Sequence, residues 1–213
     1  MTASVRSVFV VAAIGGLELV GRPEVTHGWY EQSALKGMSV GALAAHLARQ
    51  IHRVPEVLAN PVPDERPLNV VEHYTRSAWV TAGADDEPNV AIRERAAENA
   101  AIGHAEVYLR AQDSLTAVRA ALPSEPVDRV VRPPWTAWNL SLDDYLRTRL
   151  IEIVVHSDDL AVSVGVDPPD WPDEVVAPVL GVLTTLSLRR HGVPALLRTL
   201  SRAERAPADV SAF

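Results

Sequence analysis

Apolar residues recur every three or four positions along most of this chain, and this period constrains the fold more than any other feature. Val40, Leu43, Leu47 and Ile51, for example, share one face of a helix that Ser39 is suited to cap. Patterns typical of strands are scarce, and proline-rich breaks separate the helical segments. The sequence therefore predicts an all-α fold, a bundle with four long helices at its centre and additional short helices near the C-terminus.

The breaks between apolar patterns give approximate helix boundaries. Helices are expected over residues 4–20, from 40 to a stop or bend near Pro55, and over 68–79, 89–122, 142–164, 173–190 and 194–204. The segment 126–140 has β-branched residues and adjacent prolines, so an irregular or short-strand connection is expected there. Ser141 and Asp144 fit a capping box, and Gly165 is suited to end the helix that they start. We expect one domain over residues 1–206 and a polar tail over residues 207–213.

Composition excludes several classes of protein. The formal charge of −7 and the pI near 5.5 argue against a basic surface for nucleic acid. The chain has no cysteine, which excludes disulfides, thiolate metal sites and a cysteine nucleophile, so any thiol must come from outside. No apolar run reaches the roughly 18 residues of a membrane span, and Glu18 and Arg22 interrupt the apolar start. We therefore expect a cytoplasmic protein that binds neither nucleic acid nor a membrane.

Glu152 and His156 are unusual because they lie one turn apart inside the apolar pattern YLRTRLIEIVVHSDDLAV. Residues four apart point from the same side of a helix, so the two groups are either solvated or share a cation. His46 is embedded in an apolar helix face, and it would complete a set of two imidazoles and one carboxylate. A catalytic zinc site uses such a set and keeps its fourth position open. A core histidine bonded to backbone fits the same spacing, so the residues alone leave both interpretations open.

Two segments, WYEQSALKGMSVGALAAHLARQ and YLRTRLIEIVVHSDDLAVSVG, carry a family resemblance. The matching positions are Trp29, Ser33, Gly37, Ser39, Val40, Leu43, His46, Arg149, Glu152, His156, Asp159 and Leu160. The chain resembles the mycothiol-dependent maleylpyruvate isomerase family, which belongs to the wider DinB-like metal-binding helical bundles. The resemblance implies a DinB-like four-helix bundle in which His46, Glu152 and His156 bind a divalent metal, with zinc as the expected ion. It also implies mycothiol as the thiol cofactor.

The sequence departs from the family pattern at three points. Met38 stands where the family usually has tryptophan, and Gly41 and Ala42 replace a more polar pair. We expect these changes to alter the pocket wall without touching a ligand. Longer family members carry an additional C-terminal domain, in place of which this sequence has LRRHGVPALLRTLSRAERAPADVSAF. The departures leave isomerisation, thiol transfer and binding without turnover as alternatives.

The resemblance implies an enzyme that activates a low-molecular-weight thiol for attack on a small electrophilic substrate, as an isomerase or S-transferase. A metallohydrolase that uses metal-bound water and a non-catalytic metal- or ligand-binding stress protein are the alternatives. Arg149 and Asp159 are candidate catalytic residues. Asp159 could accept the free ring N–H of His156 or be solvated. Arg149 could pair with Glu152 or hold a substrate carboxylate, and Arg49 has the same two roles open to it.

Two further groups of apolar side chains have alternative roles. Trp135 and Trp138 are expected to anchor packing or to line a pocket mouth. Leucines on the last two helices could close the core or form the face of a homodimer. These leucines are Leu183, Leu186, Leu196, Leu197 and Leu200.

Overall fold

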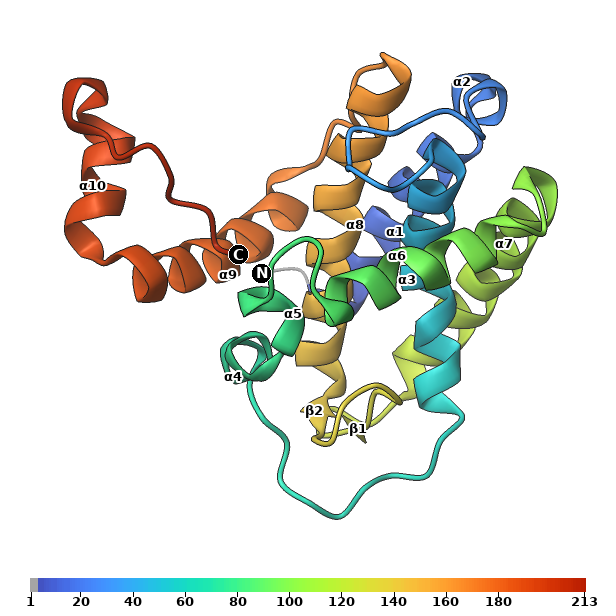
Figure 1. Cartoon of the computed structure of the whole chain (residues 1–213). Helices are drawn as coiled ribbons and strands as arrows, with labels where there is room; N and C mark the ends of the chain where they lie inside the picture. Colours follow the sequence, from blue (N-terminus) through green and yellow to red (C-terminus); the bar gives the residue numbers. More distant parts are fainter. Residues whose placement is uncertain (1–3) are drawn as a thin grey trace.

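Four long helices form the centre of the protein (Figure 1). They are α1 (Val5–Val20), α3 (Val40–Leu58), α7 (His104–Ala121) and α8 (Leu142–Val164). The computed structural model describes residues 4–213, so the first three residues of the predicted domain lie outside the described part. Helix α3 packs against α7 and α8, and α1 packs against the same two helices, burying Phe9, Leu43 and Leu146 completely. The predicted all-α bundle is confirmed.

The remaining elements, the longest of which is as long as α3, connect and extend the bundle. They are α2 (Pro23–His27), α4 (Val70–Arg76), α5 (Ala78–Thr81), α6 (Glu87–Ala100), α9 (Asp173–His191), α10 (Val193–Ser201), the 3₁₀ turns η1 (Leu122–Ser124) and η2 (Ala203–Arg205), and strands β1 (Val130–Val131) and β2 (Leu140–Ser141). The two strands pair antiparallel, with Val130 opposite Ser141, which is the short-strand connection that the sequence predicts. No helix within the described residues combines the length and the apolar character that a membrane span requires.

Backbone geometry divides two helices that the sequence predicts as single. The prediction of one helix over residues 89–122 is wrong, because Gly103 adopts a φ of +87° between α6 and α7. Only glycine adopts such a conformation readily, so the chain turns although the alanine-rich pattern continues. The helix predicted after Pro67 is likewise divided at Ser77, where ψ is 115°. Helix α3 continues past Pro55 to Leu58, so the proline removes one backbone hydrogen bond without ending the helix.

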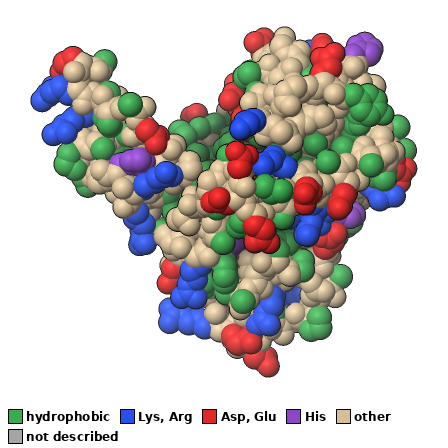
Figure 2. All heavy atoms as spheres, viewed as in Figure 1, with side chains coloured by type: hydrophobic (Ala, Val, Ile, Leu, Met, Phe, Trp, Pro, Cys, Tyr) green, Lys and Arg blue, Asp and Glu red, His purple; other side chains and the backbone are tan. Residues whose placement is uncertain are grey.

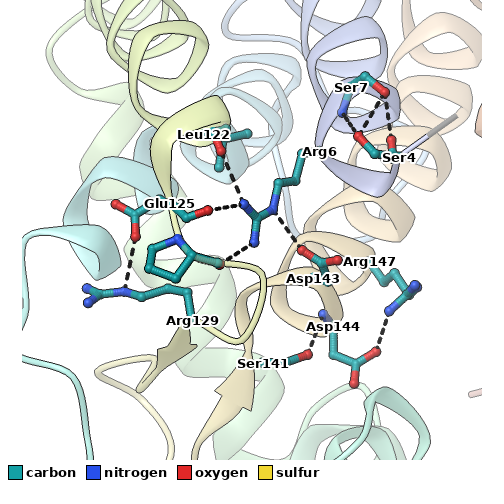
Figure 3. A network of polar contacts seen from close by, with 11 residues as sticks. Ser4, Arg6, Ser7, Leu122, Glu125, Arg129, Ser141, Asp143, Asp144 and Arg147 are labelled. Carbon is teal, nitrogen blue, oxygen red and sulfur yellow. Dashed lines mark hydrogen bonds and ion pairs between the residues drawn. The ribbon is translucent and has the colours of Figure 1, made fainter.

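Serine caps fix where α3 and α8 begin. The Ser39 hydroxyl accepts a hydrogen bond from the backbone N–H of Ala42 at 3.1 Å, and the Ser141 hydroxyl accepts one from Asp144 at 3.0 Å. The second half of the predicted capping box is replaced by another contact, because the Asp144 carboxylate accepts from Arg147 at 2.8 Å (Figure 3). Both serines therefore satisfy N–H groups that the first helical turn leaves without partners.

Gly165 ends α8, as the sequence predicts. It adopts the left-handed conformation, with a φ of +69°, and Val166 donates to the carbonyl of Ala161 at 3.1 Å. Glu152 and His156 therefore lie in the interior of a helix with two defined ends.

Arg6 joins three of the long helices at one end of the bundle (Figure 3). Its Nε lies 3.0 Å from Oδ1 of Asp143, at the start of α8. The same guanidinium donates to the carbonyl oxygens of Leu122, Glu125 and Pro126, which follow α7. Because Arg6 itself belongs to α1, these contacts fix α1, α7 and α8 relative to one another.

Gly41, in the first turn of α3, leaves room for Trp29. A Cβ at this position would lie 2.6 Å from Cε2 of Trp29 and 2.7 Å from its carbonyl oxygen. Met38 and Ala42, the other departures from the family pattern, are buried in the same core. We expect Gly41→Ala to lower the free energy of unfolding by about 1–3 kcal/mol through overpacking.

Gly181→Ala in α9 is the matched control, because a Cβ there would meet nothing within 4 Å. This variant should gain up to about 1 kcal/mol from helix propensity. Urea unfolding followed by circular dichroism measures both changes. Stabilisation of similar size in the two variants would contradict the contact between Gly41 and Trp29.

The end of α9 and the whole of α10 stand away from the bundle (Figures 1 and 2). Leu186 is buried and Leu183 packs against the core, so these two leucines close the bundle. Leu197 and Leu200 on α10 are 59% and 76% exposed. The homodimer through the leucines of the last two helices stays a prediction.

The last residues, predicted as a polar tail, lie back against the protein. The carbonyl of Val210 accepts a hydrogen bond from the Ser187 hydroxyl of α9 at 2.7 Å. The ring of Phe213 stacks on Tyr74, with centroids 5.6 Å apart, and meets the edge of Trp79 at 5.1 Å. The tail therefore links α9 to α4 and α5.

Candidate metal centre

Three side chains with metal-ligating atoms meet between α3 and α8. His46 belongs to α3, and Glu152 and His156 lie on successive turns of α8. One ligand atom from each residue lies within 4.8 Å of the other two. The Nε2 atoms of His46 and His156 are 3.2 and 3.5 Å from the same oxygen, Oε2 of Glu152. The structure thus brings together the three residues that the sequence singles out, and their role as metal ligands stays a prediction.

The apolar pattern of each helix places these groups. On α3, Leu43 and Leu47 are buried on either side of His46, which turns its ring toward α8. On α8, the four-residue spacing puts Glu152 and His156 on the same side of the helix. The three side chains are 13%, 17% and 20% exposed, so the site is shielded but remains in reach of solvent.

Burial and hydrogen bonding act in opposite directions on these groups. Burial lowers the pKa of His46 to about 4, so this imidazole is neutral at pH 7. For Glu152, burial is outweighed by hydrogen bonds from His156 and His46, which hold its pKa well below the usual value. For His156, burial is outweighed by the carboxylates of Asp159 and Glu152, which raise its pKa to about 9. The carboxylate is therefore anionic, and its surroundings favour positive charge beside it.

Asp159 holds the other ring nitrogen of His156. Its Oδ2 lies 2.9 Å from Nδ1, and this contact leaves Nε2 directed toward Glu152. An outer carboxylate of this kind fixes the tautomer and the orientation of a ligating histidine and raises its basicity. The structure places Asp159 where the sequence predicts, and its catalytic role stays a prediction.

We expect Asp159→Asn to weaken zinc binding about 10-fold, at the low end of the effect of outer-shell partners. The asparagine oxygen can still accept the ring N–H, but the negative charge that raises ligand basicity is lost. Asp158→Asn is the control, because it removes the same charge from the neighbouring exposed side chain. Competition with a chromogenic chelator measures both affinities, and equal losses would show that only the overall charge matters.

The two arginines predicted near the site have neutral partners. Arg149 is only 4% exposed, and its Nη1 donates to Oε1 of Gln50 on α3. Arg49 donates to Oδ1 of Asn99 at 3.2 Å. Within residues 4–213, Glu152 forms ion pairs with the two histidines and not with Arg149. The intrahelical pair is therefore not formed, and the alternative role of Arg149, holding a substrate carboxylate, stays a prediction.

His73 and Tyr74 on α4 lie within the electrostatic influence of Glu152, although the sequence did not mark them as site residues. Burial lowers the pKa of His73 to about 4 and raises that of Tyr74, and the charge of Glu152 acts on both. The His73 Nδ1 accepts a hydrogen bond from the Trp138 indole at 3.1 Å, so this tryptophan anchors the connection against α4. Periodicity could not place this short helix relative to α8, because a proline-rich segment precedes it.

Residues 16–161 match the sequence model of a protein family, the mycothiol maleylpyruvate isomerase N-terminal domain. The chain belongs to this family. The match covers more than half of the chain and includes His46, Glu152 and His156, so the family resemblance of the two segments is confirmed. No curated protein and no solved structure matches the chain.

Proposed function

We propose that this member of the mycothiol maleylpyruvate isomerase family is a divalent-metal-dependent enzyme that transfers or adds mycothiol to a small electrophilic substrate. The observation that carries the proposal is the convergence of His46 and His156 on the carboxylate of Glu152. The family supports mycothiol as the thiol, and the geometry supports a metal.

The donor set fits a catalytic zinc ion. Such an ion takes three protein ligands, including sets of two histidines and one glutamate, and keeps one position for water or substrate. Ligands about 2.0–2.2 Å from a tetrahedral ion lie roughly 3.4 Å apart, close to the 3.2 and 3.5 Å separations of the two Nε2 atoms from Glu152 Oε2. One carboxylate against a doubly charged cation leaves the site electrophilic. Imidazole and carboxylate also suit other divalent ions, which geometry and availability select.

Each residue of the site has a role in this proposal. A bound metal would lower the pKa of a coordinating thiol, so that the thiolate nucleophile is available at neutral pH. His46 would supply one neutral donor, and His156, whose pKa of about 9 keeps it protonated in the metal-free protein, would supply a second by releasing its proton on metal binding. Glu152 would supply the negative charge, and Asp159 would keep the His156 ring in orientation. Because the chain has no cysteine, the thiol has to be a separate molecule.

Titration of the cobalt-substituted protein with mycothiol tests the proposal. We expect a sulfur-to-cobalt charge-transfer band in the near ultraviolet that saturates with one thiol per metal. The same titration of the metal-free protein, and of the cobalt protein with an alcohol analogue of the thiol, provides the controls. Binding of cobalt without this band would reject the thiol role, and thiol-independent ester hydrolysis would then favour the metallohydrolase.

A further inference from the structure

Three arginines of α3 and α8 lie one to two helical turns from the candidate metal centre. Arg49 and Arg53 follow His46 by three and seven residues and share its side of α3. Arg149 precedes Glu152 by three residues on α8. In this arginine cluster (Arg49, Arg53 and Arg149), a rise of 1.5 Å per residue places Arg49 and Arg149 about 5 Å, and Arg53 about 10 Å, along the helices from the metal ligands.

The ring of Trp135 lies against two members of the arginine cluster. The Cζ of Arg53 lies 3.9 Å from the centroid of the Trp135 ring, and the Cζ of Arg149 lies 5.4 Å from it. Arg149 also lies 5.4 Å from the centroid of Tyr145, whose hydroxyl donates to the carbonyl of Arg53 at 3.2 Å. Because Trp135 is 38% exposed, this stack is open to solvent at one side. Stacking occupies the faces of the guanidinium and leaves its N–H edges for acceptors.

None of the three arginines forms an ion pair in the part of the chain that the structure describes, although the charge of Glu152 is near. Their protein acceptors are the neutral side chains of Asn99, Gln50 and Thr148. The Nε atoms of Arg49 and Arg53 are buried and have no hydrogen-bond partner among the described residues. Arg6 and Arg129 differ in having a carboxylate partner, since Arg6 pairs with Asp143 and Arg129 lies 3.4 Å from Glu125, although the Nε of Arg129 also has no hydrogen-bond partner among the described residues. Buried donors without acceptors are uncommon, and a bound ion is one of the ordinary reasons for them.

The clustering of these cations is electrostatically unfavourable. Burial, followed by the charges of Arg149 and Arg49, lowers the pKa of Arg53 to about 9, so its guanidinium stays charged at pH 7. Glu152 acts in the opposite direction, but two imidazoles already engage its carboxylate. Shielded cations without a counter-ion destabilise a protein, and an anion bound between them would remove that penalty.

We propose that the arginine cluster binds an oxyanion group of the electrophilic substrate and so holds its reacting carbon beside the metal centre. The identity of the anion as part of the substrate rests on the proposed function, whereas anion binding itself does not. Carboxylate and phosphate share the chemistry that recognises the forked N–H groups of arginine. Because Arg49 and Arg149 lie about one helical turn and Arg53 about two turns from the metal ligands, an anionic group held by them would lie only a few bonds from the reacting carbon.

Isothermal titration calorimetry of the metal-free protein tests the arginine cluster. The probes are succinate, inorganic phosphate and the neutral succinamide, added in the presence of a chelator. We expect saturable binding of succinate or phosphate and none of succinamide, and the tighter of the two anions identifies the oxyanion. Arg49→Gln and Arg53→Gln should each weaken binding at least about 10-fold, because a charge-assisted hydrogen bond is lost.

Two further variants keep the test independent of folding and of overall charge. Arg53→Lys keeps the positive charge but not the forked N–H groups of arginine, so its affinity for the anion should lie between those of the wild type and Arg53→Gln. Arg119→Gln removes an exposed arginine of α7 and should leave binding unchanged. The proposal is overturned if the wild type binds neither anion, if succinamide binds equally well, or if the folded Arg53 variants bind like the wild type. Because metal and thiol are absent from the titration, failure of the cobalt experiment does not change this outcome.

Discussion

Glu152→Ala is expected to weaken zinc binding by more than about 100-fold, beyond the range that loss of an outer-shell partner causes. Glu152 supplies the one negative charge of the candidate donor set and lies 3.2 and 3.5 Å from the two imidazole donors. Hydrogen bonds from His156 and His46 hold its pKa well below the usual value, so the charge is present at pH 7. Competition with a zinc-binding dye measures the affinity, and elemental analysis of the dialysed protein gives the stoichiometry.

Glu98→Ala is the matched control for this variant. Glu98 is also helical but exposed on α6, and within residues 4–213 it forms no ion pair, so its removal should leave zinc affinity unchanged. His46→Ala should lose affinity together with Glu152→Ala, because α3 contributes no other ligand to the set. One tightly bound zinc per chain in the Glu152 variant would disprove the assignment of the centre.

Much of the candidate centre could be predicted from the sequence because its residues lie in long amphipathic helices. His46 and Glu152 are 106 positions apart, yet the apolar faces of α3 and α8 determine which side of each helix faces the other. Periodicity alone could not show that the two side chains meet, since it does not give the register, which is the position of one helix along the axis of the other. The family resemblance supplied that register, and the 3.2 Å contact between the two side chains agrees with it.

Other parts of the protein could not be predicted because they depend on backbone conformation or on irregular segments. The turn at Gly103 depends on a positive φ that an alanine-rich pattern conceals. Trp135 lies in a connection without a period, so its stacking on Arg53 could not be foreseen. Arg53 itself could have been identified, because a spacing of seven residues from His46 puts both on one side of α3.

Removal of the metal with 1,10-phenanthroline is expected to slow the reaction of mycothiol with a fluorogenic electrophile at pH 7 by at least about 30-fold. A thiol with a pKa near 8.5 is only about 3% thiolate at this pH, and loss of positioning adds to that factor. The metal-free rate should rise about tenfold per pH unit below the thiol pKa, whereas the metal-loaded rate should change little from about pH 7 to 9.

The non-chelating isomer 1,7-phenanthroline is the control, and added zinc should restore both the rate and its flat pH profile. Comparison of the pH–rate profiles of the metal-free and metal-loaded protein distinguishes a collapsed site from a loss of thiol activation. A collapsed site would lower the rate at every pH and would not recover with zinc, whereas loss of thiol activation alone converges on the metal-loaded rate at high pH. If the metal-free protein reacted equally fast with the same flat profile, side chains alone would activate the thiol. His46, Glu152 and His156 would then form a structural polar contact between α3 and α8 and not a catalytic metal centre.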